Sequence, residues 1–197
     1  MKGTKNLTLI IIGGLVLMLF AWSCGSYNGL VKQDETVKNK WNDVQSSYQR
    51  RADLIPNLVN TVKGVANFEQ ETLTKVVEAR AKATSMNIDV NNLTPEKVAQ
   101  FQQAQGQLSG ALSRLLVTIE KYPELKATES FRDLQRQLEG TENRINVTRN
   151  DFNAAINTYN TKVRSFPTNM FAGMFGFAKK EGFAADAGSE KAPKVNF

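Results

Sequence analysis

The 197-residue sequence predicts an all-α protein, a long up-down-up-down antiparallel four-helix bundle preceded by one N-terminal transmembrane helix. Three observations predict this fold class. An uncharged apolar run extends from Leu7 to Cys24, and glycine and proline are scarce between Tyr27 and Phe166. Four later segments place apolar residues at alternating spacings of three and four, which is the period of a helix face. We therefore divide the chain into an anchor (1–26), a bundle (27–167) and a C-terminal segment (168–197).

The apolar run has the length and composition of a membrane-spanning helix. A bilayer core needs about 20 apolar helical residues, and the run contains no charged residue. We expect membrane lipid to be a partner of this segment. The predicted anchoring residues are Leu7, Leu9, Ile10, Ile11, Ile12, Leu15, Val16, Leu17, Met18, Leu19 and Phe20.

The same run also fits a cleaved lipoprotein signal. A basic start, an apolar centre and small residues before a cysteine are typical of secretory peptides. In Ala21-Trp22-Ser23-Cys24 the serine fits a lipobox, whereas the alanine stands where leucine is usual and the tryptophan is bulky. Cys24 is therefore either a lipidation site of a lipid-anchored lipoprotein or an apolar residue at a helix end.

Charge predicts the orientation and excludes one class of partner. Lys2 and Lys5 lie nearest the span, and cytoplasmic flanks are enriched in basic residues. This favours a single-pass protein of the cell membrane whose body is extracytoplasmic. Residues 27–166 carry 19 basic and 16 acidic side chains with interleaved signs. A nucleic-acid-binding domain clusters its basic residues on one face, so we expect no nucleic acid partner.

The first two bundle helices meet at Pro56. Proline lacks an amide hydrogen and clashes with the preceding turn, so we expect a tight hairpin there, leading into a second helix that extends to about Thr84. One kinked helix is the alternative, because the apolar spacing continues across Pro56. We prefer the hairpin, since an unbroken helix would be too long to close a compact bundle. The first seam is Tyr27, Leu30, Asp34, Val37, Trp41, Val44, Tyr48, Arg51 and Ile55, and the second is Leu58, Val59, Val62, Val65, Ala66, Leu73, Val76, Val77 and Arg80.

Two further helices complete the bundle. Thr94-Pro95-Glu96 combines a capping hydroxyl, a first-turn proline and an acid, which is a strong helix start. Thr128 or Ser130 caps the last helix, and Pro167 closes it. The third seam is Val98, Phe101, Gln105, Leu108, Leu112, Leu115, Ile119 and Tyr122, and the fourth is Phe131, Leu134, Leu138, Thr141, Ile145, Thr148, Phe152, Ala155, Tyr159, Lys162 or Val163, and Phe166. We expect Trp41 and Leu138 to lie on facing seams in the core.

The residue content does not predict an enzyme. Histidine is absent, which removes the usual general base and the commonest metal ligand. We therefore expect no catalytic residue, no cofactor and no metal. Arginine and glutamate on facing seams would pair structurally; the alternative is a hydrolase-type enzyme that uses seam carboxylates, which would need two close carboxylates of raised pKa in a pocket. The polar seam residues are Asp34, Arg51, Glu69, Arg80, Glu142, Arg144 and Arg149.

The segment after Pro167 is rich in phenylalanine and methionine and ends in Lys179-Lys180. Apolar residues followed by lysines suit a bilayer interface with anionic lipid. The alternative is that Phe171, Phe175 and Phe177 cap the open end of the bundle core. Beyond Lys180, the glycine, alanine and aspartate content predicts a flexible tail.

Several motifs resemble one family. These are Tyr27-Asn28-Gly29-Leu30-Val31, Trp41-Asn42-Asp43-Val44, the run from Tyr48 to Val59 that reads YQRRADLIPNLV, Val62-Lys63-Gly64, Val77-Glu78-Ala79-Arg80 and Leu138-Glu139-Gly140-Thr141-Glu142-Asn143-Arg144-Ile145, then Arg149, Asn153, Tyr159-Asn160 and Phe166-Pro167. The chain resembles the LemA family of bacterial membrane proteins over nearly its whole length. The resemblance implies an N-terminal membrane segment and a long antiparallel helical bundle, and it implies no activity.

The chain departs from that family pattern in two places. Val65-Ala66-Asn67-Phe68-Glu69 stands where the family commonly has a tyrosine and a histidine, and Ser23-Cys24-Gly25 is not part of the general pattern. The first departure gives no support for a histidine-dependent role, and the second leaves lipidation open. The anchor, the helical bundle and the lack of catalytic residues favour a membrane-anchored interaction or scaffold module of the bacterial cell envelope, with a protein partner in the envelope.

Overall fold

The described part of the chain is helical throughout its regular structure. The computed structural model describes residues 2–65, 68–86, 88–89 and 93–184, and the described side chains of the first helix begin at Ile10 and omit Leu19. These ranges contain no strand, which confirms the all-α prediction. The helices are α1 (Lys2–Lys63), α2 (Gln70–Ser85), α3 (Pro95–Ile119), α4 (Pro123–Lys126), α5 (Glu129–Arg164) and α6 (Asn169–Ala172).

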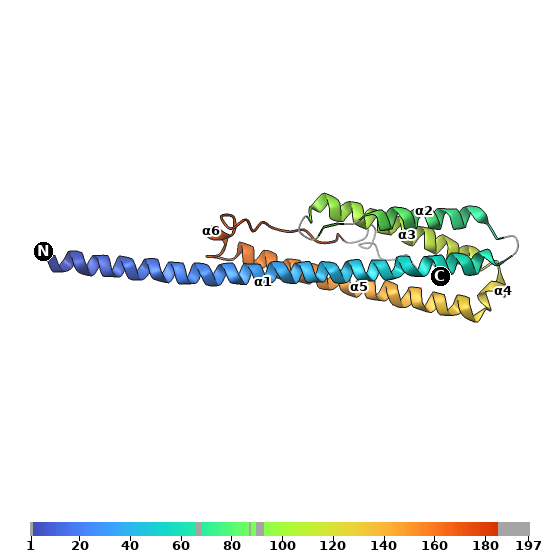
Figure 1. The fold of residues 1–197 in the computed structure, drawn as a ribbon, viewed down its shortest axis with the longest axis horizontal. Helices are drawn as coiled ribbons and strands as arrows, with labels where there is room; N and C mark the ends of the chain where they lie inside the picture. The colour runs from blue at the N-terminus through green and yellow to red at the C-terminus, as the bar shows by residue number, and fades with distance from the viewer. Residues whose placement is uncertain (1, 66–67, 87, 90–92, 185–197) are drawn as a thin grey trace, which may run out of the picture.

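Helix α1 runs the length of the molecule. Its 62 residues make a rod of about 93 Å at ~1.5 Å per residue. Helix α5 returns antiparallel beside it, since Lys40 pairs with Asp151 and Arg51 with Glu142. Helices α2 and α3 lie along the half of α1 farther from the N-terminus, and the N-terminal part of α1 extends beyond them (Figure 1).

Helix α1 passes through Pro56 without a break, so the predicted hairpin is wrong and the single-helix alternative is correct. A proline removes the amide that would donate to the carbonyl four residues earlier. That carbonyl belongs to Ala52, and it accepts instead from Nε of Arg80 on α2 at 2.8 Å. A helix of this length is compatible with the packed helices, because the N-terminal part of α1 extends beyond α2 and α3.

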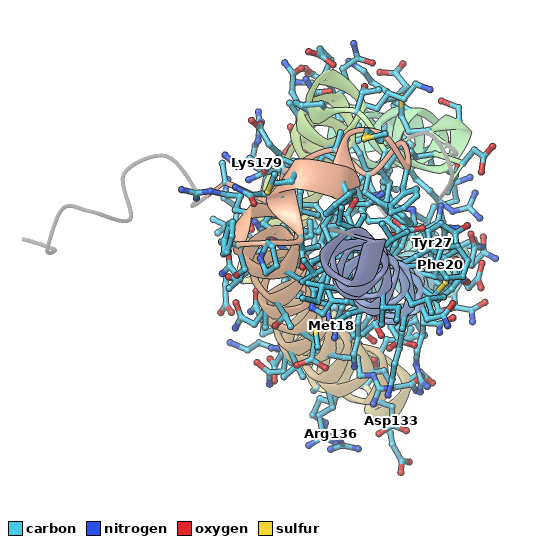
Figure 2. The ribbon with its side chains drawn as sticks, turned by 90° about the vertical axis from the view of Figure 1, so that its left-hand side faces the viewer. Met18, Phe20, Tyr27, Asp133, Arg136 and Lys179 are labelled. Carbon is cyan, nitrogen blue, oxygen red and sulfur yellow. The ribbon has the colours of Figure 1, made fainter. Side chains whose placement is uncertain are left out.

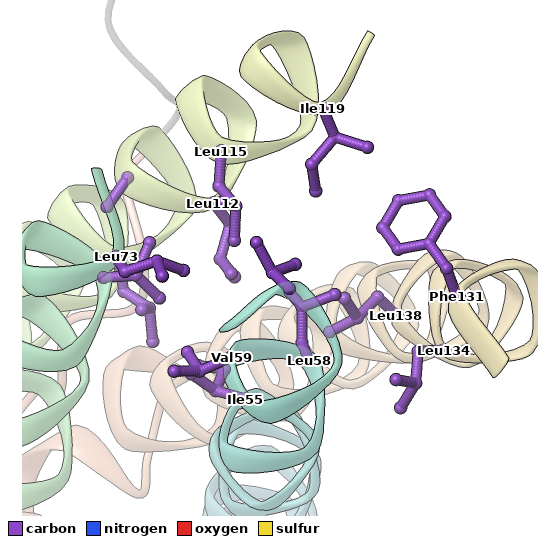
Figure 3. Close-up of a cluster of buried hydrophobic side chains, with 14 of the residues drawn as sticks. Ile55, Leu58, Val59, Leu73, Leu112, Leu115, Ile119, Phe131, Leu134 and Leu138 are labelled. Carbon is purple, nitrogen blue, oxygen red and sulfur yellow. The ribbon is translucent and has the colours of Figure 1, made fainter. Parts of the chain in front are cut away.

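The buried residues form two clusters. The cluster nearer the N-terminal part of α1, which we name the proximal cluster, is rich in aromatic residues, and it contains Leu30, Val37, Trp41, Val44, Tyr48, Ile88, Val98, Phe101, Ile145, Phe152, Ala155, Ile156, Tyr159, Val163, Ala172 and Phe183. The distal cluster is mainly aliphatic, and it contains Ile55, Leu58, Val59, Val62, Phe68, Leu73, Val76, Ala83, Leu108, Ala111, Leu112, Leu115, Ile119, Leu125, Phe131, Leu134 and Leu138. Figure 3 shows side chains from α1, α3 and α5 meeting in the distal cluster. Trp41 and Leu138 are both buried as expected, but they lie in different clusters.

The predicted seams and caps are largely confirmed. Thr94 caps α3 by accepting from the amide of Lys97, and Thr128 caps α5 by accepting from that of Phe131. Three apolar residues of the predicted seams are wrong, since Tyr27 is 43%, Val77 48% and Phe166 79% exposed. Phe166 lies beyond the end of α5 at Arg164, where helical spacing no longer places side chains on the core face. Ala66 lies outside the described residues.

Candidate functional site

The N-terminal part of α1 presents apolar side chains that no other part of the described protein covers. Exposed fractions run from 52% at Ile12 to 71% at Ile10 and Met18. The predicted anchoring residues that are exposed are Ile10, Ile11, Ile12, Leu15, Val16, Leu17, Met18 and Phe20. This stretch is long and apolar enough to cross a membrane, a test that a signal sequence also passes. The side chains of Leu7, Leu9 and Leu19 lie outside the described set, and Cys24 is exposed.

Helix α6 lies beside α1 where the apolar run ends (Figures 1 and 2). The Phe171 ring lies 5.8 Å from the Trp22 ring, and the Phe175 ring lies 5.2 Å edge-on to Tyr27. Phe177 contacts Tyr27 and packs against the proximal cluster. These rings therefore attach the segment after Pro167 to α1.

The outer face of this segment is apolar and exposed. Phe166, Met170 and Met174 are 79%, 62% and 81% exposed. Lys179 follows them, and Figure 2 shows its side chain directed away from α1. Exposed apolar side chains therefore gather at one end of the molecule, on α1 and on the segment that packs against it.

A group of polar side chains, which we name the polar layer, comes from positions that separate the two hydrophobic clusters along α1, α3 and α5. Arg51 is 1% exposed, and its Nη1 donates to Glu142 at 2.6 Å and to Ser109 at 2.8 Å. Its Nη2 donates to Oε1 of Gln105 at 2.5 Å, and its guanidinium lies over the Tyr48 ring. The predicted pairing of arginine and glutamate on facing helices is confirmed here.

The other polar seam residues do not gather at one site. Arg80 donates a hydrogen bond to the carbonyl of Ala52, whereas Glu69 and Arg144 are exposed. Asp34 pairs with Lys38 at 3.1 Å and with Lys180 at 3.0 Å. Burial acts to raise the pKa of Asp34, but the hydrogen bonds and charges of Lys180 and Lys38 outweigh it and hold that pKa below its ordinary value.

The chain from Phe177 to Ala184, which we name the C-terminal strap, lies along α5 and is held by side chains that bond to its backbone. Asn160 donates to the carbonyl of Lys180 at 2.8 Å and accepts from its amide at 2.9 Å. Asn153 does the same for Phe183, at 3.2 and 2.9 Å. The Tyr159 hydroxyl donates to the carbonyl of Ala178 at 2.9 Å.

One strap side chain enters the core. Phe183 is 7% exposed and stacks on Trp41 at 5.8 Å, with Phe152 at 5.6 Å. The Arg149 guanidinium lies over the Phe183 ring, 4.9 Å from the ring centroid. The predicted flexible tail is therefore wrong for Glu181–Ala184, and residues 185–197 lie outside the described chain. Composition missed the strap because Phe183 is a single apolar residue among small and charged ones.

Two carboxylates of α5, Glu139 and Glu142, are bonded to other side chains. A groove between α3 and α5 is lined by Glu139 and Glu142 among other residues. Glu142 pairs with Arg51, and Glu139 accepts from Gln135 at 3.0 Å. Within the described residues, no group of three or more histidine, cysteine, aspartate or glutamate side chains has an arrangement able to hold a metal ion.

Comparison with known proteins gives one consistent family. The model of the LemA family matches residues 40–197. Protein LemA of Metamycoplasma hominis is 28% identical over 122 residues, which covers 61% of this chain. The chain spans only 52% of the length of that relative. Because the family model matches well over half of the sequence, the chain belongs to the LemA family.

Proposed function

We propose that this protein is a membrane-anchored helical-bundle protein of the bacterial cell envelope that acts as an interaction or scaffold module. In this proposal residues 1–26 are the anchor, and residues 27–167 form an up-down-up-down antiparallel four-helix bundle outside the cytoplasm. Membrane lipid and a protein of the envelope are its partners, and nucleic acid is not.

The observation that carries the proposal is the exposure of the apolar face of α1. Side chains such as Ile10, Leu17 and Met18 are 70–71% exposed. A contiguous apolar surface of this kind on a protein marks an interaction with a membrane or another protein. Because apolar residues surround the helix on all sides, a bilayer covers them better than one protein face would. The continuity of α1 through Cys24 supports a retained spanning helix.

Two matched substitutions test the anchor. Val16 is 59% exposed in the apolar run, and Val147 is 57% exposed on α5. An arginine at the centre of a spanning helix costs about 2.5–3.5 kcal/mol on insertion scales. Val16→Arg should therefore move a large share of the protein out of alkali-washed membranes, whereas Val147→Arg should leave it there. Equal membrane retention of both variants would contradict the anchor.

The lipoprotein alternative and the orientation have direct tests. Intact mass spectrometry of membrane-extracted protein should find a chain that keeps Met1 or Lys2 and carries no lipid. A chain that begins at a diacylated Cys24 would replace the spanning helix by a lipid anchor. Protease added to spheroplasts should cut the body of the chain, and protection of the body until lysis would reverse the orientation.

The segment that includes α6 supports a second contact with lipid. It adjoins the end of the apolar run, and its exposed methionines precede two lysines that suit anionic headgroups. Residues 27–197 should therefore bind anionic liposomes, and Met170→Glu with Met174→Glu should abolish the binding. Val117→Glu on α3, where valine is 69% exposed, is the control. Equal binding of all three proteins would exclude this contact.

The scaffold role is favoured over the hydrolase alternative by the polar layer. A hydrolase that uses carboxylates needs groups free to accept and donate a proton near substrate. Glu142 is instead bonded to a buried arginine, an arrangement that fixes helix register. The interaction surfaces of the bundle are therefore where we place its function.

A further inference from the structure

The C-terminal strap is recognised through its backbone, in register with α5. Asn153 and Asn160 are seven residues apart, which is about 10.5 Å along a helix. Lys180 and Phe183 are three residues apart, which is about 10 Å in an extended chain. The two distances match, so each asparagine meets the amide and the carbonyl of one strap residue. An asparagine that makes both bonds contacts only the backbone of the extended chain, so these bonds do not depend on which side chain the bound residue carries.

The ends of the strap are bonded in the same way. Tyr159 donates to the carbonyl of Ala178, and Gln102 and Arg149 donate to that of Ala184 at 3.1 and 3.4 Å. The donors come from α3 and α5. The strap is therefore held at both ends and twice between them, always by side chains of the folded helices acting on its main chain.

Three features make the groove selective. The Phe183 ring fills an aromatic pocket made by Trp41, Phe101 and Phe152. A Cβ added at Gly182 would collide with Oδ1 of Asn153, so a larger residue there must displace the side-chain oxygen that accepts from the amide of Phe183. The ammonium of Lys180 pairs with Asp34 and lies over the Tyr159 ring at 5.4 Å. The sequence that fits is lysine, any residue, glycine, aromatic.

The helices that form the pocket also contact one another directly. The Trp41 ring contacts Phe101 at 5.4 Å and Phe152 at 5.2 Å, which joins α1, α3 and α5 directly. The residues that lead into the strap are exposed, among them Met174 and Gly176. The strap can therefore leave as a unit while the helices that form the groove stay packed.

We propose that this groove is a binding site for an extended peptide of a partner protein with the pattern Lys-x-Gly-aromatic, and that the strap occupies it as an internal competitor. The proposal rests on the interaction role given above, and it names the chemistry of the partner. Binding of the partner releases the strap, and the acidic Asp34 and the aromatic pocket select the peptide.

The test uses the full chain in lipid nanodiscs and a fluorescein-labelled peptide of sequence FAKKEGFA, which copies residues 177–184. Gly182→Ala weakens the strap in place, so this variant should bind the probe about tenfold or more tightly than the unaltered chain. A probe with alanine in place of glycine should bind the variant about tenfold or more weakly. Adding Asn153→Ala to the variant removes two of the bonds to the probe and should abolish binding.

Two results would overturn the proposal. One is failure of the Gly182→Ala chain to bind the probe while its helical circular dichroism is unchanged. The other is equal binding of the glycine and alanine probes. Both results concern the groove alone. A chain that stays in membranes but gives either result contradicts the peptide site and leaves the proposed anchor intact. A chain that binds the probe but does not stay in membranes contradicts the anchor and leaves the peptide site intact.

A measurement on the unaltered chain covers the case in which the variant does not fold. The amides of Lys180 and Phe183 donate to Asn160 and Asn153, so they should exchange slowly with deuterium. Excess unlabelled FAKKEGFA should release the strap and speed their exchange, and the alanine peptide should not. Exchange that stays unchanged at saturating peptide would contradict an exchangeable strap.

Discussion

The continuity of α1 depends on a hydrogen bond from another helix. Pro56 deprives the Ala52 carbonyl of its helical donor, and Ala52 is 3% exposed. Arg80 donates to that carbonyl from α2 at 2.8 Å. A hydrogen bond from a charged group contributes about 1.5–3 kcal/mol, and an unsatisfied buried carbonyl costs about as much. Arg80→Ala should therefore lower the free energy of unfolding by about 2 kcal/mol.

The same substitution should be nearly harmless once Pro56 is replaced by alanine. The new amide then donates to the Ala52 carbonyl within the helix, and Arg80 becomes a surface side chain worth about 0.5 kcal/mol. Pro56→Ala alone should stabilise the protein, by less than the ~3 kcal/mol that an uncompensated proline costs. The double-mutant cycle thus predicts a coupling of about 1.5 kcal/mol.

Urea unfolding in mild detergent, followed by circular dichroism, measures the four proteins of this cycle. A loss of about 2 kcal/mol corresponds to about 4–8 °C in melting temperature for a chain of this size. Arg136→Ala is the control, because its side chain is 72% exposed and pairs with Asp133, whose side chain is 46% exposed. An equal cost of Arg80→Ala in both backgrounds would show that Arg80 does not compensate for Pro56.

Three further predictions follow from the core. Glu142→Ala leaves the buried Arg51 guanidinium without its carboxylate and should lower the free energy of unfolding in urea by about 2–4 kcal/mol. The control Glu139→Ala should lower it by under about 0.5 kcal/mol, and similar values for the two variants would contradict the role of the Arg51–Glu142 pair. Trp41→Ala and Leu138→Ala should each cost about 2–5 kcal/mol, and unchanged melting temperatures would exclude their core positions. Burial, with the charge of Asp34 second, raises the pKa of Tyr159 to about 12, so the stability it gives is complete below about pH 10 and is lost as the pH rises toward 12. In a phenolate absorbance titration Tyr159 should therefore ionise near pH 12, and Tyr159→Phe should remove that step.

The periodic parts of the fold were predictable from the sequence. Seams with strict spacing lie on α3 and α5, where a run such as Leu108, Leu112 and Leu115 reports one buried face. The caps Thr94 and Thr128 were predictable because their hydroxyls satisfy helix-end amides locally. Sequence rules for seams and caps succeed where the deciding interaction joins residues that are close to each other in the sequence.

Long-range bonds explain the failures. Nothing near Pro56 in the sequence shows that Arg80 will supply its missing donor, so a local rule ends the helix there. The strap was missed for the same reason, because its backbone bonds go to Asn153 and Asn160, twenty or more positions away. The one usable signal was the pair of asparagines on one face of α5. An arginine–glutamate pair between facing helices was predictable, since a buried charge on a seam requires a partner, and the structure forms this pair between Arg51 and Glu142.

The most direct test of a membrane-anchored α1 uses the protein's two tryptophans. Trp22 ends the apolar run, and Trp41 lies about 28 Å farther along α1, inside the bundle. In bilayers of brominated lipid, the Trp41→Phe protein should show strong quenching of Trp22, and the Trp22→Phe protein should show none at Trp41. Equal quenching in both proteins, or a Trp41→Phe protein whose Trp22 fluoresces unquenched, would contradict the account. If the Trp41→Phe protein shows no tryptophan fluorescence at all, Trp22 has been removed and the chain was cut before Cys24.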